Sequence, residues 1–243
     1  MAILSSFWNE QILFLKIQVF SWVADIAGYT KQGAYKMLNV IFDMDGTLLD
    51  SEGSICEAVN AIRKDMGLPI LAHESIQHAI HTPGLNCAKI FYGIENFPHK
   101  SYKVGFEKYF SKYYENAILF ENVREMLQTC KERNYFLAIA SNAPQDGLEP
   151  ILQRHHIAQY FDMIIGTNPQ TESKPSPMMI HKIIAKAPFK MSVFVGNCLK
   201  DEGAAKNANI SYLQAKWGEE MHADNEFSNT NELLAKLDAI LGM

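Results

Sequence analysis

The amino-acid sequence predicts an α/β protein with a doubly wound parallel sheet and a helical segment inserted near its start. From residue 120 to the C-terminus, short apolar runs typical of buried strands alternate with amphipathic segments of helical period. Between residues 51 and 115 the apolar residues recur at helical spacing, without an alternating strand pattern. The length of 243 residues suits one large domain, or a core domain with a smaller insert.

The first predicted strand, residues 38–42, is a mostly apolar run that Asp43 closes. Asp45 follows two positions later, and side chains two apart in an extended chain point to the same side. Gly46 permits a sharp turn, and Thr47 adds a hydroxyl. Two neighbouring carboxylates repel each other, and a divalent cation such as Mg²⁺ relieves that repulsion. The pattern therefore indicates phosphoryl transfer, in which Asp43 attacks phosphorus and Asp45 serves as acid and then as base.

The remaining elements follow from apolar periodicity and turn residues. After the first strand, a helical stripe from Ile55 to Met66 ends at Gly67, and further helices are expected at 71–80, at 87–93 and around 104–113. The second half of the chain is predicted to form helix 123–133, strand 135–140, helix 148–155, strand 161–166, helix 177–186, strand 193–196, helix 203–208, strand 210–215 and helix 231–241, the last capped by Thr230.

Polar residues follow three of these strands: Asp43, Ser141 and Asn197. Sites in parallel sheets gather at the carboxyl ends of the strands, so we expect these three side chains to lie near one another. The Ser141 hydroxyl and the backbone amide of Asn142 are donors that suit a phosphate oxygen.

The composition is that of an ordinary soluble enzyme, with 48% apolar residues and a mean hydropathy of −0.11. A net charge of −5 and a pI near 5.9 argue against nucleic acid and anionic membranes as partners, so an anionic substrate needs locally placed cations. The four cysteines lack CxxC spacing, which indicates reduced thiols in a cytoplasmic protein without a zinc site.

Residues 1–37 carry one apolar helical stripe from Leu4 to Ile26, broken by charged residues. Its longest apolar stretch is too short to span a bilayer, and no signal-peptide pattern is present. An amphipathic helix that packs on the core or on a second subunit is one interpretation, in a monomer or a homodimer. A membrane-surface helix is disfavoured because the polar face is not basic. The third interpretation is that the physiological chain starts at Met37.

Residues 43–50, DMDGTLLD, resemble the first motif of the haloacid dehalogenase superfamily, in the DxDGT form of its phosphatases and phosphomutases. Ser141 matches the second motif and Lys174, in Ser-Lys-Pro-Ser-Pro, the third. Residues 196–201 resemble the fourth motif, usually GDxxxD, but Asn197 replaces its first acid while Asp201 keeps the second.

The resemblance covers residues 38–243 and implies a Rossmann-like core formed by residues 38–52 and 116–243. It also implies a helical cap at 53–115, as in the phosphoglycolate phosphatase and β-phosphoglucomutase branch. Asn122, Asn134 and Asn209 stand where relatives usually carry glycine. Asparagine is the residue that best tolerates the left-handed conformation after glycine, so we expect that conformation at all three positions.

The resemblance also implies the roles of individual residues. The catalytic set is Asp43, Asp45, Thr47, Ser141 and Lys174, and the Mg²⁺ ligands are Asp43, Asp45 through its carbonyl, Asn197 and Asp201. The substrate-binding set is Ser141, Asn142, Lys174, His81 and Thr82. The last two precede Pro83-Gly84, whose order is reversed relative to the family's cap loop, so a turn without a ligand role explains them equally well. Asn197 brings no charge, so a weaker magnesium site is predicted.

The predicted function is that of a magnesium-dependent phosphatase that hydrolyses a small phosphorylated metabolite through an aspartyl phosphate. Phosphoglycolate is the substrate that the resemblance implies. A phosphosugar mutase is an alternative, which an assay for isomerised sugar phosphate separates. A metal-poor relative that binds a phosphorylated ligand or a partner without turnover is the other alternative, suggested by Asn197 and by residues 1–37.

Overall fold

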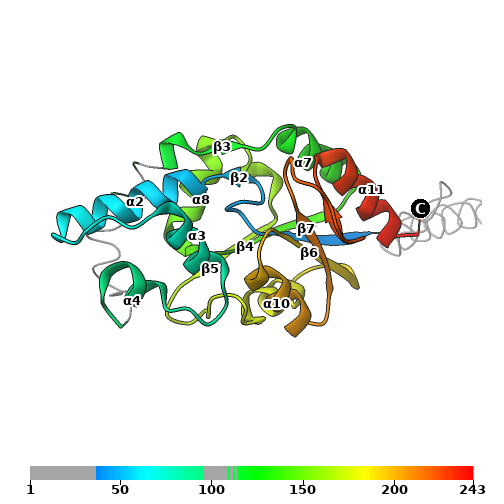
Figure 1. The fold of residues 1–243 in the computed structure, drawn as a ribbon. Helices are drawn as coiled ribbons and strands as arrows, with labels where there is room; N and C mark the ends of the chain where they lie inside the picture. The colour runs from blue at the N-terminus through cyan, green and yellow to red at the C-terminus, as the bar shows by residue number, and fades with distance from the viewer. Residues whose placement is uncertain (1–36, 96–108, 110–111, 113, 243) are drawn as a thin grey trace, which may run out of the picture. The chain divides into compact units, whose positions relative to one another are not determined.

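The computed structural model describes residues 37–95, 109, 112 and 114–242 (Figure 1). The expectations for residues 1–36, and for all of the helix around 104–113 except residues 109 and 112, lie outside the described residues. Within the described part of the chain, no helix has the length and apolar content needed to cross a bilayer.

The described chain forms a six-stranded sheet with the order β5-β4-β1-β6-β7-β8. Its strands are β1 (Leu38–Phe42), β4 (Phe136–Pro144), β5 (Met163–Thr167), β6 (Met191–Gly196), β7 (Ser211–Ala215) and β8 (Glu226–Phe227). All neighbouring pairs are parallel, and β1 lies inside the sheet, with Val40 opposite Leu137 of β4 and Val193 of β6. This confirms the predicted parallel sheet, to which the short β8 is an unpredicted addition.

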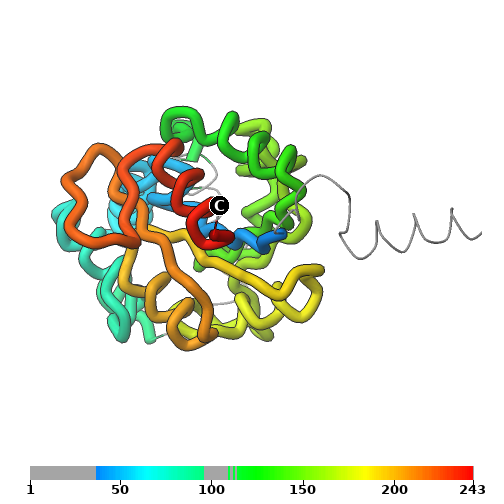
Figure 2. Tube along the Cα trace, turned by 90° about the vertical axis from the view of Figure 1, so that its right-hand side faces the viewer, coloured from blue at the N-terminus to red at the C-terminus, as the bar shows by residue number. Residues whose placement is uncertain are grey.

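Helices cover both faces of the sheet, as a doubly wound fold requires. They are α7 (Val123–Glu132), α8 (Gln145–Arg154), α9 (Met178–Ile184), α10 (Leu199–Asn207) and α11 (Thr230–Ile240). Alternate residues of β1 enter different cores: Val40 and Phe42 pack in the cluster that contains α7 and α11, whereas Ile41 packs in the cluster that contains α9 and α10. In Figure 2, α7 and α11 lie on one side of the sheet and α10 lies on the other.

A separate group of helices lies between two short strands, β2 (Leu49–Asp50) and β3 (Ile118–Leu119), which pair antiparallel. They are α2 (Glu52–Asp65), α3 (His73–His81) and α4 (Cys87–Tyr92). These helices have a hydrophobic cluster of their own, which includes Val59, Ile76 and Phe91. The helical insert is therefore present where the sequence predicts it, while its exact limits at residues 53 and 115 stay a prediction.

Several local expectations differ from the structure. Helices α2 and α8 each begin three residues earlier than expected, at Glu52 and Gln145. Strand β4 continues beyond residue 140 to Pro144, although its register with β5 shifts there. Helix α10 begins at Leu199 rather than 203, because Cys198 and Asp201 form a capping box that starts it earlier. The cap of α11 is Asn229 and not Thr230, since the Asn229 side chain accepts a 3.0 Å hydrogen bond from the backbone N–H of Glu232.

The left-handed residues confirm a finer prediction. Asn122, Asn134 and Asn209 have φ values of 59°, 59° and 56°. His156, at 56°, is a further left-handed position that the sequence did not indicate. The geometry expected at glycine positions is therefore present on asparagine.

Candidate active site

The turn after β1 brings its polar residues against the end of β6. The backbone N–H of Asp43 donates a 2.8 Å hydrogen bond to the carbonyl of Val195 and so extends the sheet by one residue. Gly46, where the sequence predicts a sharp turn, has a left-handed conformation with φ at +76°. A Cβ atom at this position would lie 2.1 Å from Nδ2 of Asn197. Glycine is therefore required here both for the turn and for the close approach of Asn197.

A single buried ammonium joins the two acidic motifs. Lys174 Nζ forms an ion pair with Oδ1 of Asp43 and a second, 2.6 Å long, with Oδ1 of Asp201. The exposed fractions of the Lys174, Asp43 and Asp201 side chains are 3%, 8% and 1%. The three side chains come from the loop after β5, the end of β1 and the first turn of α10. The structure thus brings together three sequence-predicted residues that are far apart in the chain.

Burial decides the protonation behaviour of this cluster. Burial raises the pKa of Asp43, the Lys174 ammonium opposes this, and the Asp201 and Asp45 carboxylates add to it, so that the pKa is about 7. Burial also raises the pKa of Asp45. For Lys174, burial favours the neutral amine, but the Asp201 and Asp43 carboxylates outweigh it and raise the pKa, so the group stays a cation.

Two hydroxyl groups hold the Asp45 carboxylate. Ser51 Oγ donates to Asp45 Oδ1 at 2.6 Å, and the Tyr114 hydroxyl donates to the same oxygen at 2.8 Å. Ser51 precedes α2, and Tyr114 begins a 3₁₀ turn, Tyr114–Asn116, just before β3. Both connections between the core and the helical insert therefore contact the predicted acid and base. Sequence reasoning missed both residues. Ser51 had a weak signal, a polar residue at a helix start, but its side chain does not cap α2.

Side chains predicted to be in the site hold the end of β4 and the loops after β5 and β6. Asn142 Oδ1 accepts a 2.7 Å hydrogen bond from the backbone N–H of Lys174, which fixes the lysine backbone. The Ser141 side chain is buried and accepts a 3.0 Å bond from the Ala143 backbone N–H. Asp201 Oδ2 accepts from the backbone N–H groups of Asn197 and Cys198, at 3.0 and 3.1 Å. The predicted phosphate contacts of Ser141 and Asn142 stay predictions.

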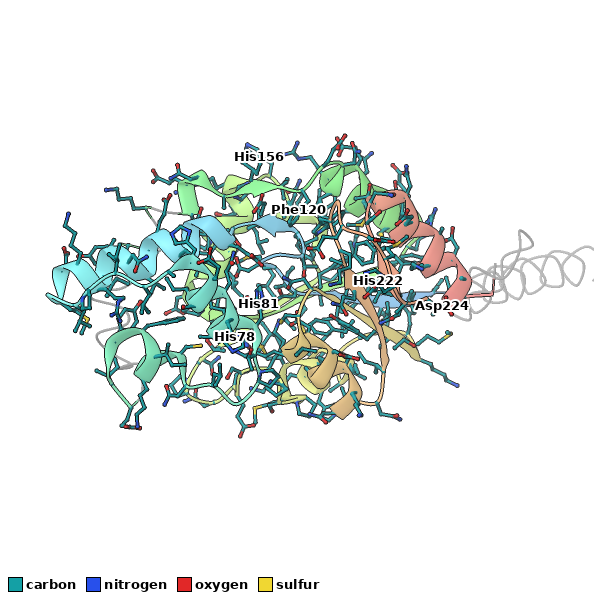
Figure 3. The ribbon with its side chains drawn as sticks, in the orientation of Figure 1. His78, His81, Phe120, His156, His222 and Asp224 are labelled. Carbon is teal, nitrogen blue, oxygen red and sulfur yellow. The ribbon has the colours of Figure 1, made fainter. Side chains whose placement is uncertain are left out.

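Thr47 and Asn197 lie side by side at the edge of the site. The Thr47 hydroxyl is 3.5 Å from Oδ1 of Asn197, and the Thr47 carbonyl accepts a 3.1 Å bond from Nε1 of Trp217. Trp217 in turn stacks on Phe120, with ring centroids 4.8 Å apart. Phe120, labelled in Figure 3, follows β3, so the Thr47 turn is also tied to the chain that returns from the insert. Nothing in the sequence pattern pointed to Trp217.

His81 and Thr82 lie at the end of α3 and make contacts within the insert. His81 Nε2 is 3.2 Å from Oε1 of Glu52, and the Thr82 hydroxyl is 3.4 Å from Nδ1 of His78. Lys200 Nζ of α10 donates a 3.2 Å hydrogen bond to the carbonyl of Ala79, so the end of α3 lies against the core. Figure 3 shows His78 and His81 near α10. Their predicted contact with substrate stays a prediction.

The sequence model of a family described as haloacid dehalogenase-like hydrolase matches residues 40–215. The chain belongs to this family. The matched region contains every residue of the predicted site, from Asp43 to Asp201.

Among curated relatives of this hydrolase, a phosphoglycolate phosphatase of Colwellia psychrerythraea is 28% identical over 82% of this chain and 96% of its own length. A phosphoglycolate phosphatase of Pseudomonas syringae is 27% identical over 79% of this chain and 75% of its own length. The fold is similar to that of a predicted phosphoglycolate phosphatase from Haemophilus somnus, with a TM-score of 0.66, 24% identity, and 82% and 97% of the two chains covered. A haloacid dehalogenase-like hydrolase from Streptococcus pneumoniae matches with a TM-score of 0.64 and 21% identity, and the match covers 83% of this chain and 99% of that one.

Phosphatases of this superfamily generally use a divalent metal, and the residues at this edge of the sheet fit one. When ionised, the carboxylates of Asp43, Asp45 and Asp201 leave a charge of −2 after the Lys174 ammonium is counted, which a hard divalent cation neutralises. Among the described residues, no three His, Cys, Asp or Glu side chains are arranged as a metal site. The candidate ligand set therefore depends on the Asn197 amide oxygen and the Asp45 carbonyl in addition to Asp43.

Proposed function

We propose that this hydrolase is a magnesium-dependent phosphatase that acts on a small phosphorylated metabolite, with phosphoglycolate as the first candidate. The buried Lys174, paired with both Asp43 and Asp201 at the end of β1, is the observation that carries the proposal. It holds a carboxylate in place as a nucleophile beside a cation that can bind the transferring phosphoryl group. The curated relatives named phosphoglycolate phosphatase support the choice of substrate.

In the proposed reaction, a carboxylate oxygen of Asp43 attacks phosphorus, and the bond from phosphorus to the ester oxygen breaks. Asp45 gives its proton to the departing alkoxide, and its raised pKa favours the protonated form that this step requires. Asp45 then takes a proton from water, which attacks phosphorus, releases inorganic phosphate and restores the Asp43 carboxylate. Ser51 and Tyr114 keep the Asp45 carboxyl in one orientation during both steps.

The phosphoryl oxygens are proposed to bind Lys174, the Ser141 hydroxyl and the Asn142 backbone amide. Magnesium would be held by Asp43, the Asp45 carbonyl and Asn197, with Asp201 close by. When bound, it supplies positive charge that offsets the carboxylates and the phosphoryl group. Asp201 also fixes the Asn197–Cys198 backbone and pairs with Lys174, so we assign it a positioning role as well.

The neutral Asn197 favours one second candidate, a metal-poor relative that binds a phosphorylated ligand without turnover. The side chain packs against Gly46, in the position that the fourth motif gives to an acid. A chain that binds phosphoglycolate but releases no phosphate at saturating Mg²⁺ would support this candidate.

Phosphate release from phosphoglycolate and from p-nitrophenyl phosphate, with Mg²⁺ and then with excess chelator, tests the proposal. We expect activity that requires Mg²⁺ and falls by about three orders of magnitude or more in Asp43→Asn, because that variant lacks the nucleophile. The exposed Asp224→Asn is the matched control and should keep full activity. Undiminished hydrolysis by Asp43→Asn would refute the assignment of the nucleophile.

A further inference from the structure

Lys200 is a half-buried cation that the proposed mechanism does not use. It lies in the first turn of α10, next to Asp201. Its ammonium donates to the neutral carbonyl of Ala79 at 3.2 Å, and this is its one recorded polar contact with the described residues. An ammonium has three donors, so at least two remain for another acceptor. No described carboxylate forms an ion pair with it, so its charge is not offset by a direct partner.

Lys200 lies where the core meets the insert, along a continuous series of contacts. The nucleophile Asp43 connects through Lys174 to Asp201, the sequence neighbour of Lys200. On the other side, Lys200 contacts the last turn of α3, which ends in His81.

The same series continues from α3 back to the acid and base. His81 pairs with Glu52 at 3.2 Å, and Glu52 follows Ser51, which binds Asp45. Lys200 therefore lies at the border between the core and the end of α3, between residues that lead to Asp43 on one side and to Asp45 on the other.

The cations around the site differ in how far neighbouring carboxylates already offset their charge. Lys174 is already paired with two carboxylates, and the charge of a protonated His81 would be offset by Glu52. Arg63, in α2, is buried and donates to the carbonyls of Pro69 and Phe91 inside the insert. Among these groups, Lys200 alone combines a position at this border with an uncompensated charge.

We infer that Lys200 binds a second anionic group of the substrate, a carboxylate, on the side away from the transferring phosphoryl group. The inference rests on the proposed function and restricts its substrates to phosphorylated carboxylic acids. Lys200 is then a specificity residue and takes no part in the bond changes at phosphorus.

The test compares kcat/KM for phosphoglycolate and for 2-hydroxyethyl phosphate, a compound of similar size with a neutral hydroxyl in place of the carboxylate. The wild-type chain should prefer phosphoglycolate. Lys200→Gln should lower the ratio of the two kcat/KM values by about ten- to a hundredfold, the usual effect of one charge-assisted hydrogen bond. Lys200→Arg should keep most of the ratio. Lys206→Gln removes an exposed cation from the other end of α10 and should leave the ratio unchanged.

An unchanged ratio in Lys200→Gln would overturn the inference, even if both activities fall in parallel, because Lys200 would then only join α10 to α3. A wild-type chain without preference for phosphoglycolate would overturn it as well. In both cases hydrolysis that depends on Asp43 would leave the proposed phosphatase activity standing. A chain that hydrolyses neither compound would contradict both.

Discussion

Compared with the acid usual at this position of the fourth motif, Asn197 removes one negative charge from the site and keeps the shape of the side chain. The amide packs on Gly46 and its oxygen lies 3.5 Å from the Thr47 hydroxyl. An aspartate has the same outline and would add one negative charge at a position where the proposed metal is held. The natural residue therefore weakens the attraction for a cation while keeping the turn intact.

Asn197→Asp should lower the Mg²⁺ concentration that gives half-maximal phosphate release by about tenfold, equivalent to about 1.4 kcal/mol of binding free energy. The measurement is a magnesium titration of activity at constant ionic strength. Asn231→Asp, which adds the same charge on an exposed residue of α11, is the control. An identical magnesium requirement in Asn197→Asp would exclude residue 197 from the metal site.

The sequence identified residues that carry a local pattern, and it missed those that act through distant contacts. Asp43, Asp45 and Gly46 are recognisable because a strand, paired acids and a glycine follow one another. Tyr114 lies 69 residues from the carboxylate that it binds, and no spacing rule connects the two. Ser51 is adjacent in sequence, but its partner depends on how the chain turns after β1.

Among the elements, long periodic segments were predicted well and short ones poorly. The strand β1 and the helix α7 have the expected limits within one residue, whereas α2 begins three residues earlier than the predicted stripe, at Glu52. The strands β2, β3 and β8 have two residues each, too few for an alternating pattern. The early start of α10 depends on Cys198, a residue type that does not usually mark a helix start.

The hydrogen bond that caps the N-terminus of α11 should contribute measurably to the free energy of unfolding. Asn229→Ala should lower the free energy of unfolding by about 1 kcal/mol, because the backbone N–H of Glu232 loses its acceptor. Urea unfolding followed by circular dichroism measures the change. Asn231→Ala, two residues later and exposed, should change stability by less than about 0.5 kcal/mol. Equal effects of the two substitutions would show that Asn229 is not the cap.

At the scale of the whole molecule, the site exists only because the sheet brings distant strand ends together. Lys174 is 131 residues from Asp43, and the two meet because β5, which precedes Lys174, and β1, which precedes Asp43, are parallel strands separated only by β4 in the sheet. The prediction that the strand ends share an edge anticipated this meeting. It did not anticipate that one ammonium would pair with both carboxylates, since side-chain partners depend on packing rather than on topology.

Lys174→Met should lower the free energy of unfolding by about 3–5 kcal/mol near pH 8, because two buried carboxylates lose their cation. Burial already raises the pKa of Asp43, and loss of the ammonium that lowers it raises this pKa further, so the folded variant takes up a proton more readily as the pH falls. The deficit should therefore be smaller at pH 5 than at pH 8, as measured by urea unfolding without Mg²⁺. Lys186→Met, at an exposed position, is the control. A deficit that is the same at both pH values would contradict the charge argument.

The most direct measurement is the identification of the covalent adduct. The chain is mixed with substrate and Mg²⁺, quenched within milliseconds, treated with borohydride to reduce acyl phosphates, and digested for mass spectrometry. We predict homoserine at position 43. With p-nitrophenyl phosphate, whose leaving group departs without a proton, we expect more of it in Asp45→Asn, which lacks the base that activates water. Turnover without any modification of Asp43, or with an adduct on another residue, would contradict the account.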